Sequence, residues 1–346
     1  MPSYRLCQPR FLPRLTILAG LCVIGISGVS VSSAAVAGRV TTSTSAPTAK
    51  TVLPAPGFGV TLPGAPTDLT ALTALTTALA HPPSTVMWYS QWATSPDFPA
   101  AGATAVAATG AVPEITWEPW DPSLGIAQPA YTLASISSGT HDSYLKRWAT
   151  QIHRYGKPLR LRFGHEMNGN WYPWAERVNT NSPGSYVAAW RHVHRVFANA
   201  GASNVTWVWS PNVSYTGSTP LAQLYPGDRT VDEVALDGYN WSTLLPWTTW
   251  QPFSSIFTPT RRQIAALTTR PLSIGETAST EIGGDKAEWI SDLFDALAAE
   301  PQITGFTWFN WHKETDWRID SSSSSLQAFR SGLQRMTRSS LPHEFR

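Results

Sequence analysis

The sequence predicts an α/β protein, a (β/α)8 TIM barrel in a single domain, and three observations lead to this fold class. Short apolar runs alternate with amphipathic segments along the chain, as they do in parallel βαβ units. Residues 57–338, the expected folded domain, have the length of one such barrel. No glycine-rich phosphate loop follows a predicted strand, which favours the barrel over a doubly wound sheet.

The first 56 residues are expected to lie outside this barrel. A basic leader precedes an apolar run over residues 15–31, and Ala35-Val36-Ala37 is the cleavage pattern of a secretory signal peptide. A membrane anchor is the alternative, but the run contains three glycines and two serines and is short for a membrane span. We therefore expect residues 1–37 to be a signal peptide and the mature protein to be secreted into the extracellular space.

Two short segments flank the expected domain. Residues 38–56 are rich in serine, threonine, proline and alanine and are predicted to be a linker or lead-in, and residues 339–346 a C-terminal tail. The two cysteines of the chain, Cys7 and Cys22, both fall within the expected signal peptide. Its cleavage would leave a protein without disulfides or cysteine ligands for a metal, so packing must hold the fold together.

Seven strands and six helices are predicted from their periodicity. The strands, short runs of apolar and β-branched residues, are Val86–Tyr89, Val112–Thr116, Leu159–Phe163, Val205–Trp209, Val234–Leu236, Leu272–Ile274 and Gly305–Phe309. The helices, longer amphipathic segments between them, are predicted near Asp68–Ala80, Tyr144–Tyr155, Tyr186–Ala200, Ile256–Leu267, Lys286–Ala299 and Ser325–Met336. One strand is still needed to make eight, and it is predicted as the third in order, within Tyr131–Ile136.

The composition argues against a charged ligand. The formal net charge is +2 and charged residues make up 14% of the chain, so there is neither a basic face for nucleic acid nor an acidic tail. All 17 tryptophans lie at or after Trp88. A single tryptophan is most often a core residue, but so many in a weakly charged domain also suggest surfaces that stack on sugars. The substrate is therefore expected to be neutral.

Two glutamates follow predicted strands, at the end of the barrel where such enzymes carry their chemistry. Glu166 comes after Leu159–Phe163, and Glu276 comes after Leu272–Ile274. Glycoside hydrolysis uses two such carboxyl groups, one protonated to donate to the leaving oxygen and one ionised to attack the anomeric carbon. Either glutamate alone is more often a loop or helix-capping carboxylate. A zinc site of the H-E-x-x-H type is excluded because Gly169 stands where the second histidine would be.

The segment around Glu166 resembles the acid/base segment of glycoside hydrolase family 26, which is best known for β-mannanases. It reads Arg-Phe-Gly-His-Glu-Met-Asn-Gly over residues 162–169, with tryptophans at positions 171 and 174. The resemblance extends in family order to four more segments, Pro113–Trp120, Asp237–Asn240, Ile274–Ser279 and Phe309–Asp320. It implies that residues 57–338 are a (β/α)8 glycoside hydrolase catalytic domain with a retaining mechanism, in which the two carboxyl groups lie roughly 5–5.5 Å apart.

Taken residue by residue, the resemblance implies that Glu166 is the acid/base and Glu276 the nucleophile. His165 then matches a residue that helps hold the substrate and the catalytic carboxylates. Tyr239 matches the tyrosine that hydrogen-bonds the nucleophile and so keeps its pKa low. Trp171 matches an aromatic residue that lines the cleft near the acid/base.

Three further residues are predicted near the substrate. Trp308 or Trp311 would be the floor beneath the reacting sugar, and the sequence leaves this choice open because inward and outward positions alternate along a strand. Arg162 is expected either to help keep a carboxylate ionised or to make a purely structural salt bridge.

These observations predict a secreted endo-β-glycoside hydrolase with β-1,4-mannan as its first expected substrate. β-1,3-Xylan and mixed-linkage β-glucan are the alternatives, since the resemblance covers all three. A hydrolase of small glycosides and a non-catalytic glycan-binding barrel are two further alternatives, although both glutamates are present. We expect a monomer with no nucleic-acid partner, no membrane attachment after signal cleavage, and no metal or other cofactor.

Overall fold

The computed structural model describes residues 57–339. The expected signal peptide (residues 1–37), the expected linker (residues 38–56) and residues 340–346 of the expected tail lie outside the described residues. The first residue of that tail, Ser339, is the last residue of a helix.

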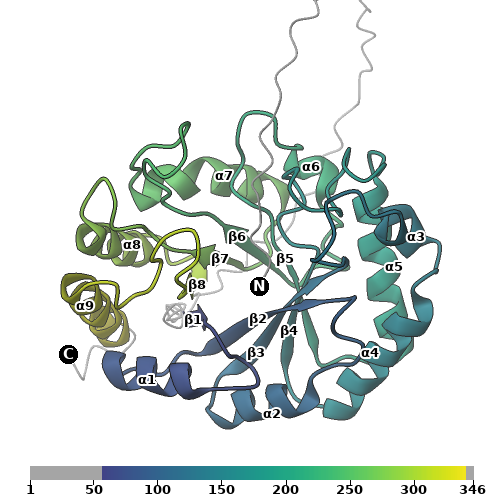
Figure 1. Cartoon of the computed structure of the whole chain (residues 1–346), viewed down its shortest axis with the longest axis horizontal. Coiled ribbons are helices and arrows are strands. Elements are labelled where there is room, and N and C mark those ends of the chain that lie inside the picture. The colour runs from purple at the N-terminus through teal and green to yellow at the C-terminus, as the bar shows by residue number, and fades with distance from the viewer. Residues whose placement is uncertain (1–56, 340–346) are drawn as a thin grey trace, which may run out of the picture. The chain divides into compact units, whose positions relative to one another are not determined.

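Eight parallel strands close into a barrel in sequence order, which confirms the predicted fold class (Figure 1). The barrel closes because β1 pairs with β2 on one side and with β8 on the other. The strands are β1 (Gly57–Thr61), β2 (Thr85–Gln91), β3 (Val112–Glu118), β4 (Leu159–Phe163), β5 (Val205–Trp209), β6 (Glu233–Asp237), β7 (Leu272–Thr277) and β8 (Ile303–Phe309).

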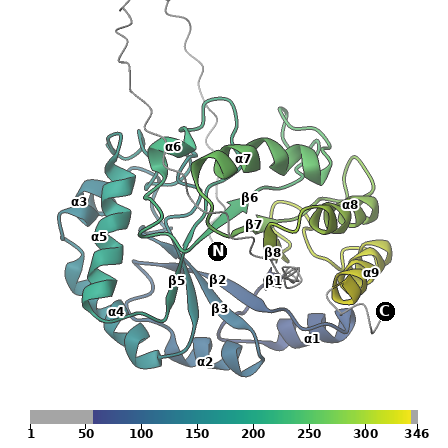
Figure 2. The ribbon, with the colours of Figure 1, turned by 180° about the vertical axis from the view of Figure 1, so that it is seen from behind.

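Helices alternate with the strands and form a ring around the barrel, as both views show (Figures 1 and 2). They are α1 (Thr70–Leu79), α2 (Ala100–Ala108), α3 (Leu133–Ser137), α4 (Asp142–Tyr155), α5 (Ser185–Asn199), α6 (Leu221–Leu224), α7 (Phe253–Leu267), α8 (Lys286–Ala299) and α9 (Ser323–Ser339), with a short 3-10 helix η1 (Pro129–Tyr131). Among the residues described, no helix combines the length and the apolar character needed to cross a membrane.

The prediction of a strand within Tyr131–Ile136 is wrong, because this stretch belongs to η1 and α3. The hydroxyl of Thr132 accepts a hydrogen bond from the N–H of Ser135 at 3.1 Å, which caps the start of α3. Leu133 and Ile136 are both buried, and their spacing of three residues places them on one side of a helix. A polar cap followed by that spacing is a helix signal, which the strand prediction overlooked.

The strand missing from the prediction is β1, where two of five residues are glycine. Glycine weakens the apparent strand preference of a short segment. Here it allows a close approach, because a Cβ atom on Gly59 would lie 2.6 Å from Oγ1 of Thr307 on β8. A Cβ atom on Gly57 would lie 2.9 Å from Oγ of Ser84. The feature that hides β1 in the sequence is therefore what lets it pack between β2 and β8.

Two helices, α2 and α6, have no counterpart in the prediction. The α2 segment is alanine-rich and lacks the contrast between apolar and polar faces that reveals a surface helix. It buries only Ala103 and Val106 along its inner side. The α6 helix has four residues, too few for a periodic pattern.

Tryptophans fill much of the core between the strands and the helices. Trp117 on β3, Trp148 on α4 and Trp190 on α5 are fully buried. The ring centroids of Trp117 and Trp148 lie 4.9 Å apart, within the usual range of aromatic packing. For these tryptophans, core packing is the correct interpretation. They hold α4 and α5 against the wall of the barrel and thereby fix the strand that leads to Glu166.

Candidate active site

Glu166 and Glu276 come from strands on different sides of the barrel and lie at the same end of it. Glu276 is part of β7, and Glu166 follows the last residue of β4 by three positions. The backbone of Glu166 has a φ of 51°, a left-handed conformation that is uncommon outside glycine and concentrates at functional sites. Its N–H donates to the carbonyl of Ser210, just past β5, at 2.7 Å. This bond ties the unusual turn to the neighbouring strand.

Both carboxyl oxygens of Glu166 accept hydrogen bonds. Oε2 accepts from Nε1 of Trp171 at 2.7 Å, and Oε1 accepts from Nδ2 of Asn212 at 2.8 Å. Burial and the negative charge of Glu276 nevertheless raise the pKa of Glu166 to about 7. Glu166 can therefore carry a proton close to neutral pH, as a general acid must.

Glu276 receives a hydrogen bond on each carboxyl oxygen from a strong donor. Oε1 accepts from Nη1 of Arg162 at 2.8 Å, and Oε2 accepts from the hydroxyl of Tyr239 at 2.6 Å. Burial alone would raise the pKa of Glu276, but the charge of Arg162 and the bond from Tyr239 lower it below its usual value. Two carboxyl groups at one end of the barrel thus have opposite pKa shifts.

Arg162 lies at the centre of this buried network and is itself fully buried. Besides Glu276, its guanidinium donates to Oδ2 of Asp237 at 2.5 Å and to Oγ of Ser210 at 2.8 Å. Arg162 was expected either to help keep a carboxylate ionised or to make a purely structural salt bridge. Its direct contact with Glu276 supports the first of these two interpretations. Burial raises the pKa of Asp237 well above its usual value, against the charge of Arg162.

His165 is buried among aromatic rings instead of being bonded to the carboxylates. Its ring centroid lies 4.8 Å from that of Tyr172, which in turn stacks on Trp174 at 4.3 Å. Burial lowers the pKa of His165 to about 3, so its imidazole is neutral. Its Nδ1 has no hydrogen-bond partner among the described residues and lies 4.0 Å from Oε1 of Glu118.

Glu118 is a third buried carboxyl group near the site, at the last position of β3, and no role was predicted for it from the sequence. Its Oε2 accepts from Nε2 of Gln91, the last residue of β2, at 2.6 Å. Burial raises the pKa of Glu118 to about 7, although the bonds from Gln91 and Trp120 act in the opposite direction. Glu118 and Gln91 therefore add polar groups to the strand ends of β2 and β3.

Asn212, which bonds Glu166, and Asp237, which bonds Arg162, were not predicted as site residues either. The sequence position of Asn212, Asp237 and Glu118 could have identified all three as candidate site residues. Each is the last residue of a strand or follows one within three residues, and this is the rule that identified Glu166. Their contacts, in contrast, join strands that are far apart in the chain and cannot be read from the sequence.

Two aromatic side chains stand beside Glu166. Trp171, predicted to line the cleft, stacks on Tyr215 with ring centroids 5.8 Å apart. A Cβ atom on Gly169 would lie 2.6 Å from the Trp171 ring, so only glycine lets the indole fold back over this turn. Tyr215 is 41% exposed, which leaves this aromatic pair accessible from solvent.

The two tryptophans proposed as the floor of the site have different environments. Trp308 is fully buried on the outer side of β8, packed against Trp289 of α8 and Phe329 of α9. It therefore cannot contact a sugar in the barrel mouth, and the prediction is corrected for this residue. Trp311, just past β8, is partly buried, stacks on Phe309, and has an Nε1 without a partner among residues 57–339. Trp311 is the remaining candidate for the floor.

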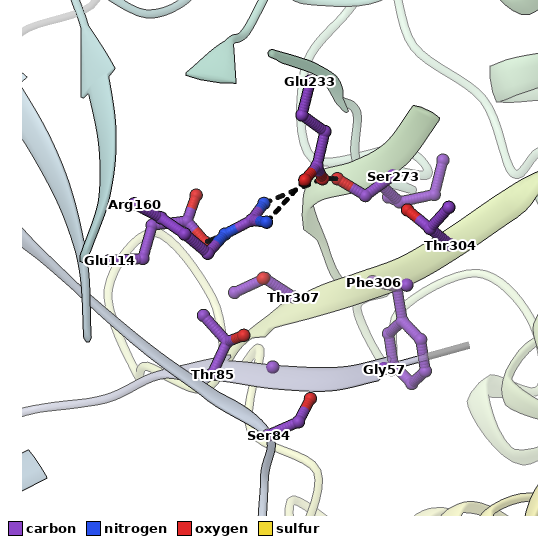
Figure 3. Close-up of a pocket in the computed structure, with 13 residues that line it drawn as sticks. Gly57, Ser84, Thr85, Glu114, Arg160, Glu233, Ser273, Thr304, Phe306 and Thr307 are labelled. Atoms are coloured by element: carbon purple, nitrogen blue, oxygen red, sulfur yellow. Dashed lines mark hydrogen bonds and ion pairs between the residues drawn. The ribbon is translucent and has the colours of Figure 1, made fainter. Parts of the chain in front are cut away.

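A cavity of about 70 Å³ lies toward the amino ends of the strands, away from the two catalytic candidates (Figure 3). Arg160 crosses it between Glu114 and Glu233, and Ser273 bonds the same Glu233 (Figure 3). Every charged group there already has a charged partner. We therefore assign the chemistry to the carboxyl end of the barrel, where the barrel fold also leads one to expect it.

The donor groups of the site fit acid/base chemistry on carboxyl groups. In the part of the chain that the structure describes, no cluster of three or more histidine, cysteine, aspartate or glutamate side chains is arranged to hold a metal ion. The carboxyl end of the barrel does bring together a group able to donate a proton, a group held ionised, and accessible aromatic rings beside them.

Comparison with known sequences agrees with the motif analysis. The profile described as glycosyl hydrolase family 26 matches residues 141–269. Endoglucanase H of Acetivibrio thermocellus is 39% identical over 252 residues, which cover 71% of this chain and 27% of that protein. Mannan endo-1,4-beta-mannosidase A and B of Caldalkalibacillus mannanilyticus is 36% identical over 95 residues, which cover 26% of this chain and 18% of that protein. The chain thus spans less than a third of the length of either relative.

Solved structures share the barrel. A modular endo-beta-1,4-mannanase from Cellulomonas fimi superposes with a TM-score of 0.61 at 19% identity, covering 81% of this chain and 70% of that chain. The catalytic domain of the family 26 endo-beta-1,4-mannanase from Bacillus sp. JAMB-750 gives a TM-score of 0.61 at 17% identity, covering 81% of this chain and 86% of that chain. At such identities the likeness shows the fold and leaves the substrate open.

Proposed function

We propose that this chain, whose resemblance to glycosyl hydrolase family 26 is confirmed, cleaves internal bonds of a neutral β-linked polysaccharide with retention of configuration. One observation carries the proposal. Two buried carboxyl groups at the carboxyl end of the barrel have opposite pKa shifts, with that of Glu166 raised to about 7 and that of Glu276 lowered. A double displacement needs one protonated and one ionised carboxyl group in the free enzyme.

In the first step, the ionised Glu276 attacks the anomeric carbon while the protonated Glu166 donates its proton to the leaving oxygen. The product is a covalent glycosyl-enzyme ester on Glu276. In the second step, Glu166 takes a proton from water, the water attacks the anomeric carbon, and Glu276 leaves as a carboxylate.

The coupling of the two pKa values helps both steps. The charge of Glu276 contributes to the raised pKa of Glu166, which keeps Glu166 protonated before the first step. The ester formed on Glu276 carries no charge, so this repulsion disappears in the intermediate and the pKa of Glu166 falls. The same group is thereby adjusted first for proton donation and then for proton removal.

The neighbours of the two glutamates have supporting roles in this scheme. Tyr239 and Arg162 orient Glu276 and hold it ionised through their bonds to its two oxygens. Trp171 and Asn212 fix the plane of the Glu166 carboxyl group in the same way. Binding of the sugar is assigned to the exposed aromatic and polar groups at the strand ends, including Trp311.

For the substrate we place a β-glucan first and β-1,4-mannan second, which reverses the order expected from the sequence. The match to a protein named endoglucanase extends over 252 residues, whereas the match to the mannosidase of Caldalkalibacillus mannanilyticus extends over 95. The longer match covers 71% of this chain and the shorter one 26%. Mannan stays the second candidate because the mannosidase of Caldalkalibacillus mannanilyticus is 36% identical over the 95 residues that it shares with this chain.

We further propose that the enzyme is secreted and acts as a monomer outside the cell. The leader of residues 1–37 supports secretion through its apolar run and its Ala-x-Ala cleavage pattern. A neutral polysaccharide is too large to be taken up intact, so an extracellular location agrees with the proposed substrate. Detection of the processed protein in culture medium, with its N-terminus at Gly38, would test this part.

The function is tested by incubating the purified protein with mixed-linkage β-glucan, β-1,4-glucan, β-1,4-mannan and β-1,3-xylan. We expect the highest kcat/KM on a glucan, with viscosity falling before much reducing sugar appears, as internal cleavage requires. Proton NMR should show the β anomer first. The Glu276→Ala variant is the control for contaminating activity. An initial α anomer would overturn the retaining mechanism, and a preference for mannan would restore the original order of substrates.

A further inference from the structure

Lys286 occupies an unusual position for a lysine. It is the first residue of α8 and is only 1% exposed. The amino end of a helix carries a partial positive charge that disfavours a cation, and burial of an ammonium group is costly unless the group is fully bonded. The charge of Lys286 therefore does not stabilise α8, and its hydrogen-bond partners lie in another segment.

The ammonium group of Lys286 bonds the segment between β8 and α9. It donates to the carbonyl of Asp316 at 3.2 Å, to the carbonyl of Arg318 at 2.7 Å and to Oγ of Ser321 at 2.9 Å. An ammonium group has three hydrogen atoms to donate, and all three are used here. The group also lies 5.8 Å from the ring centroid of Trp308, close enough for a cation–π interaction.

The carbonyl of Trp317, which lies between those of Asp316 and Arg318 in the chain, is also hydrogen-bonded. It accepts a hydrogen bond from Nε1 of Trp308 at 2.9 Å, so three consecutive carbonyl groups are bonded from the side of α8 and β8. The Trp317 N–H donates to the carbonyl of Trp311 at 2.9 Å, which joins this stretch to the candidate floor of the site. The segment from Trp311 to Arg318 is therefore a fixed loop.

The other side of this loop supports the nucleophile. The ring of Trp317 is fully buried and packs against Tyr239 and Trp241, with centroids 5.4 and 5.0 Å apart. The Tyr239 hydroxyl donates to Oε2 of Glu276 at 2.6 Å. A continuous set of contacts thus runs from the ammonium group through Trp317 and Tyr239 to the carboxyl group that the proposed mechanism uses as nucleophile.

We propose that Lys286 is a positioning residue, whose ammonium group fixes the loop after β8 and thereby holds Tyr239 against Glu276. The inference rests on the proposed function for its catalytic consequence, but its structural content is independent of any substrate. Without the ammonium group, the carbonyls of Asp316 and Arg318 lose a partner and Trp317 can shift. A small displacement of Tyr239 would weaken its bond to Glu276 and raise the pKa of Glu276.

Charged groups from each neighbouring segment face Lys286. Glu281 comes from the loop before α8, and Asp316, Arg318 and Asp320 come from the loop after β8. Burial lowers the pKa of Lys286 to about 8, while the three carboxylates act to raise it and Arg318 acts to lower it. The ammonium group is therefore present below about pH 8, and its bonds are lost as the pH rises through that value.

The test uses Lys286→Met, which keeps an unbranched side chain, one heavy atom shorter, and removes its donors. The matched control is Lys146→Met, since Lys146 lies on α4 with a side chain that is 65% exposed. The pKa of Glu276 is measured in each folded protein by carbon-13 NMR of labelled glutamate, with the signal assigned through Glu276→Gln. We expect this pKa to rise in Lys286→Met and to stay at the wild-type value in Lys146→Met.

Kinetics provide the second readout. We expect kcat/KM at pH 6 to fall by up to about 100-fold in Lys286→Met, because a misplacement of about 1 Å can cost this much. The fall should largely disappear in a Tyr239→Phe background, because the lysine acts through that tyrosine. An unchanged pKa of Glu276 in folded Lys286→Met, or full additivity with Tyr239→Phe, overturns the inference.

A milder variant covers the case in which Lys286→Met does not fold. Ser321→Ala removes one of the three acceptors of the ammonium group and should shift the pKa of Glu276 in the same direction by less. No shift in that variant would also count against the inference. If the wild-type protein hydrolyses no polysaccharide while the NMR shift appears, the proposed function fails and the positioning role stands.

Discussion

Two arginines on β4, at the amino and carboxyl ends of the barrel, show how one kind of ion cluster can serve two purposes. Arg160 and Arg162 are two residues apart on the strand and therefore point to the same side of it, into the barrel. At the amino end, Arg160 pairs with Glu114 at 2.9 Å and with Glu233 at 2.5 Å. Glu233 also accepts from Ser273 at 2.6 Å, so both of its oxygens are bonded within the protein.

At the carboxyl end, Arg162 bonds Asp237 at 2.5 Å and Glu276 at 2.8 Å, and a longer contact of 3.9 Å from its Nε to Oε1 of Glu114 links the two clusters. Here the second oxygen of Glu276 accepts from Tyr239, on a loop outside the strands, and the charge of Glu276 acts on Glu166. The pairing chemistry is the same at both ends. The two ends differ in the segments that surround the cluster. At the carboxyl end, the loops that follow the strands bring further groups, such as Tyr239, into contact with it.

The largest effect on activity is expected when a carboxylate of one cluster, Glu276, is replaced, in contrast to the replacement of Glu233 in the other cluster. Glu276→Ala should lower kcat/KM by roughly 10⁴-fold or more on every substrate, since it removes the nucleophile. Added azide should restore turnover and give the α-glycosyl azide. Glu233→Gln is the matched change at the amino end and should keep near wild-type activity while lowering stability in urea. Comparable losses of activity in both variants would contradict the division of roles.

The next largest effect is expected at Glu166, whose pKa is raised in part by the charge of Glu276. Glu166→Ala should lower kcat/KM on polysaccharide by about 10²–10⁴-fold, the usual contribution of a general acid. Aryl glycosides with good leaving groups should still form the glycosyl-enzyme, because they need no proton, and azide should release it as the β-glycosyl azide. Azide products of the opposite configuration in the two glutamate variants would show that the roles are exchanged.

Replacing each arginine by methionine compares the clusters directly. In the wild type, kcat/KM needs ionised Glu276 and protonated Glu166, so the profile is bell-shaped, with an alkaline limb near pH 7. Arg162→Met removes the charge that lowers the pKa of Glu276, so the acid limb should move to higher pH. Arg160→Met should leave both limbs in place.

The cost of Arg160→Met is expected in stability. It leaves Glu233 buried without a cation and leaves Glu114 with only the longer contact to Arg162 at 3.9 Å, which should lower the free energy of unfolding by about 3–5 kcal/mol in urea denaturation. An acid limb that moves in Arg160→Met as much as in Arg162→Met would show that the two clusters are not separate.

The smallest effect on activity is expected for two tryptophans at β8, one beside the mouth of the barrel and one on its outer side. Trp311→Ala should raise KM with little change in stability, because this ring is partly exposed past the end of β8. Trp308→Ala should leave KM unchanged and lower the free energy of unfolding by about 3–5 kcal/mol, because it removes a buried ring between β8 and α9. It should also lower kcat, because it removes the bond to the Trp317 carbonyl in the loop that holds Tyr239. A raised KM in Trp308→Ala alone would contradict this assignment.

The strand predictions show where local pattern is enough. β4 and β5 were predicted with their observed bounds, and the other five predicted strands were found with longer ends. These strands are short segments of mostly buried residues between more exposed segments, and most of them are rich in apolar residues, although two of the five residues of β4 are arginines. The prediction failed at β1, whose glycines fit a close approach to Thr307, and at α3, which lies in the stretch that was predicted to be a strand.

The candidate site divides in a similar way. Periodicity and strand ends are local properties, so the amino-acid sequence is enough to predict the fold class and to name the residues at or just past the carboxyl ends of β4, β6 and β7. Glu166 and Glu276 follow from these local properties, whereas Tyr239 was named through the resemblance to glycoside hydrolase family 26. The opposite pKa shifts of the two glutamates do not follow from local properties, because they depend on burial and on the contact between Arg162 and Glu276, which only the closed barrel creates.

Which aromatic and charged side chains face the site is likewise a consequence of the folded barrel. Trp308 and Trp311 are equivalent candidates in the sequence, and only closure of the barrel turns one toward α9 and leaves the other beside the mouth. Lys286 has the sequence context of an exposed helix residue, yet the loop after β8 folds over it and uses all its donors. The environment of a side chain is made by segments distant in the chain, and the free energy of a buried charge depends on those same segments.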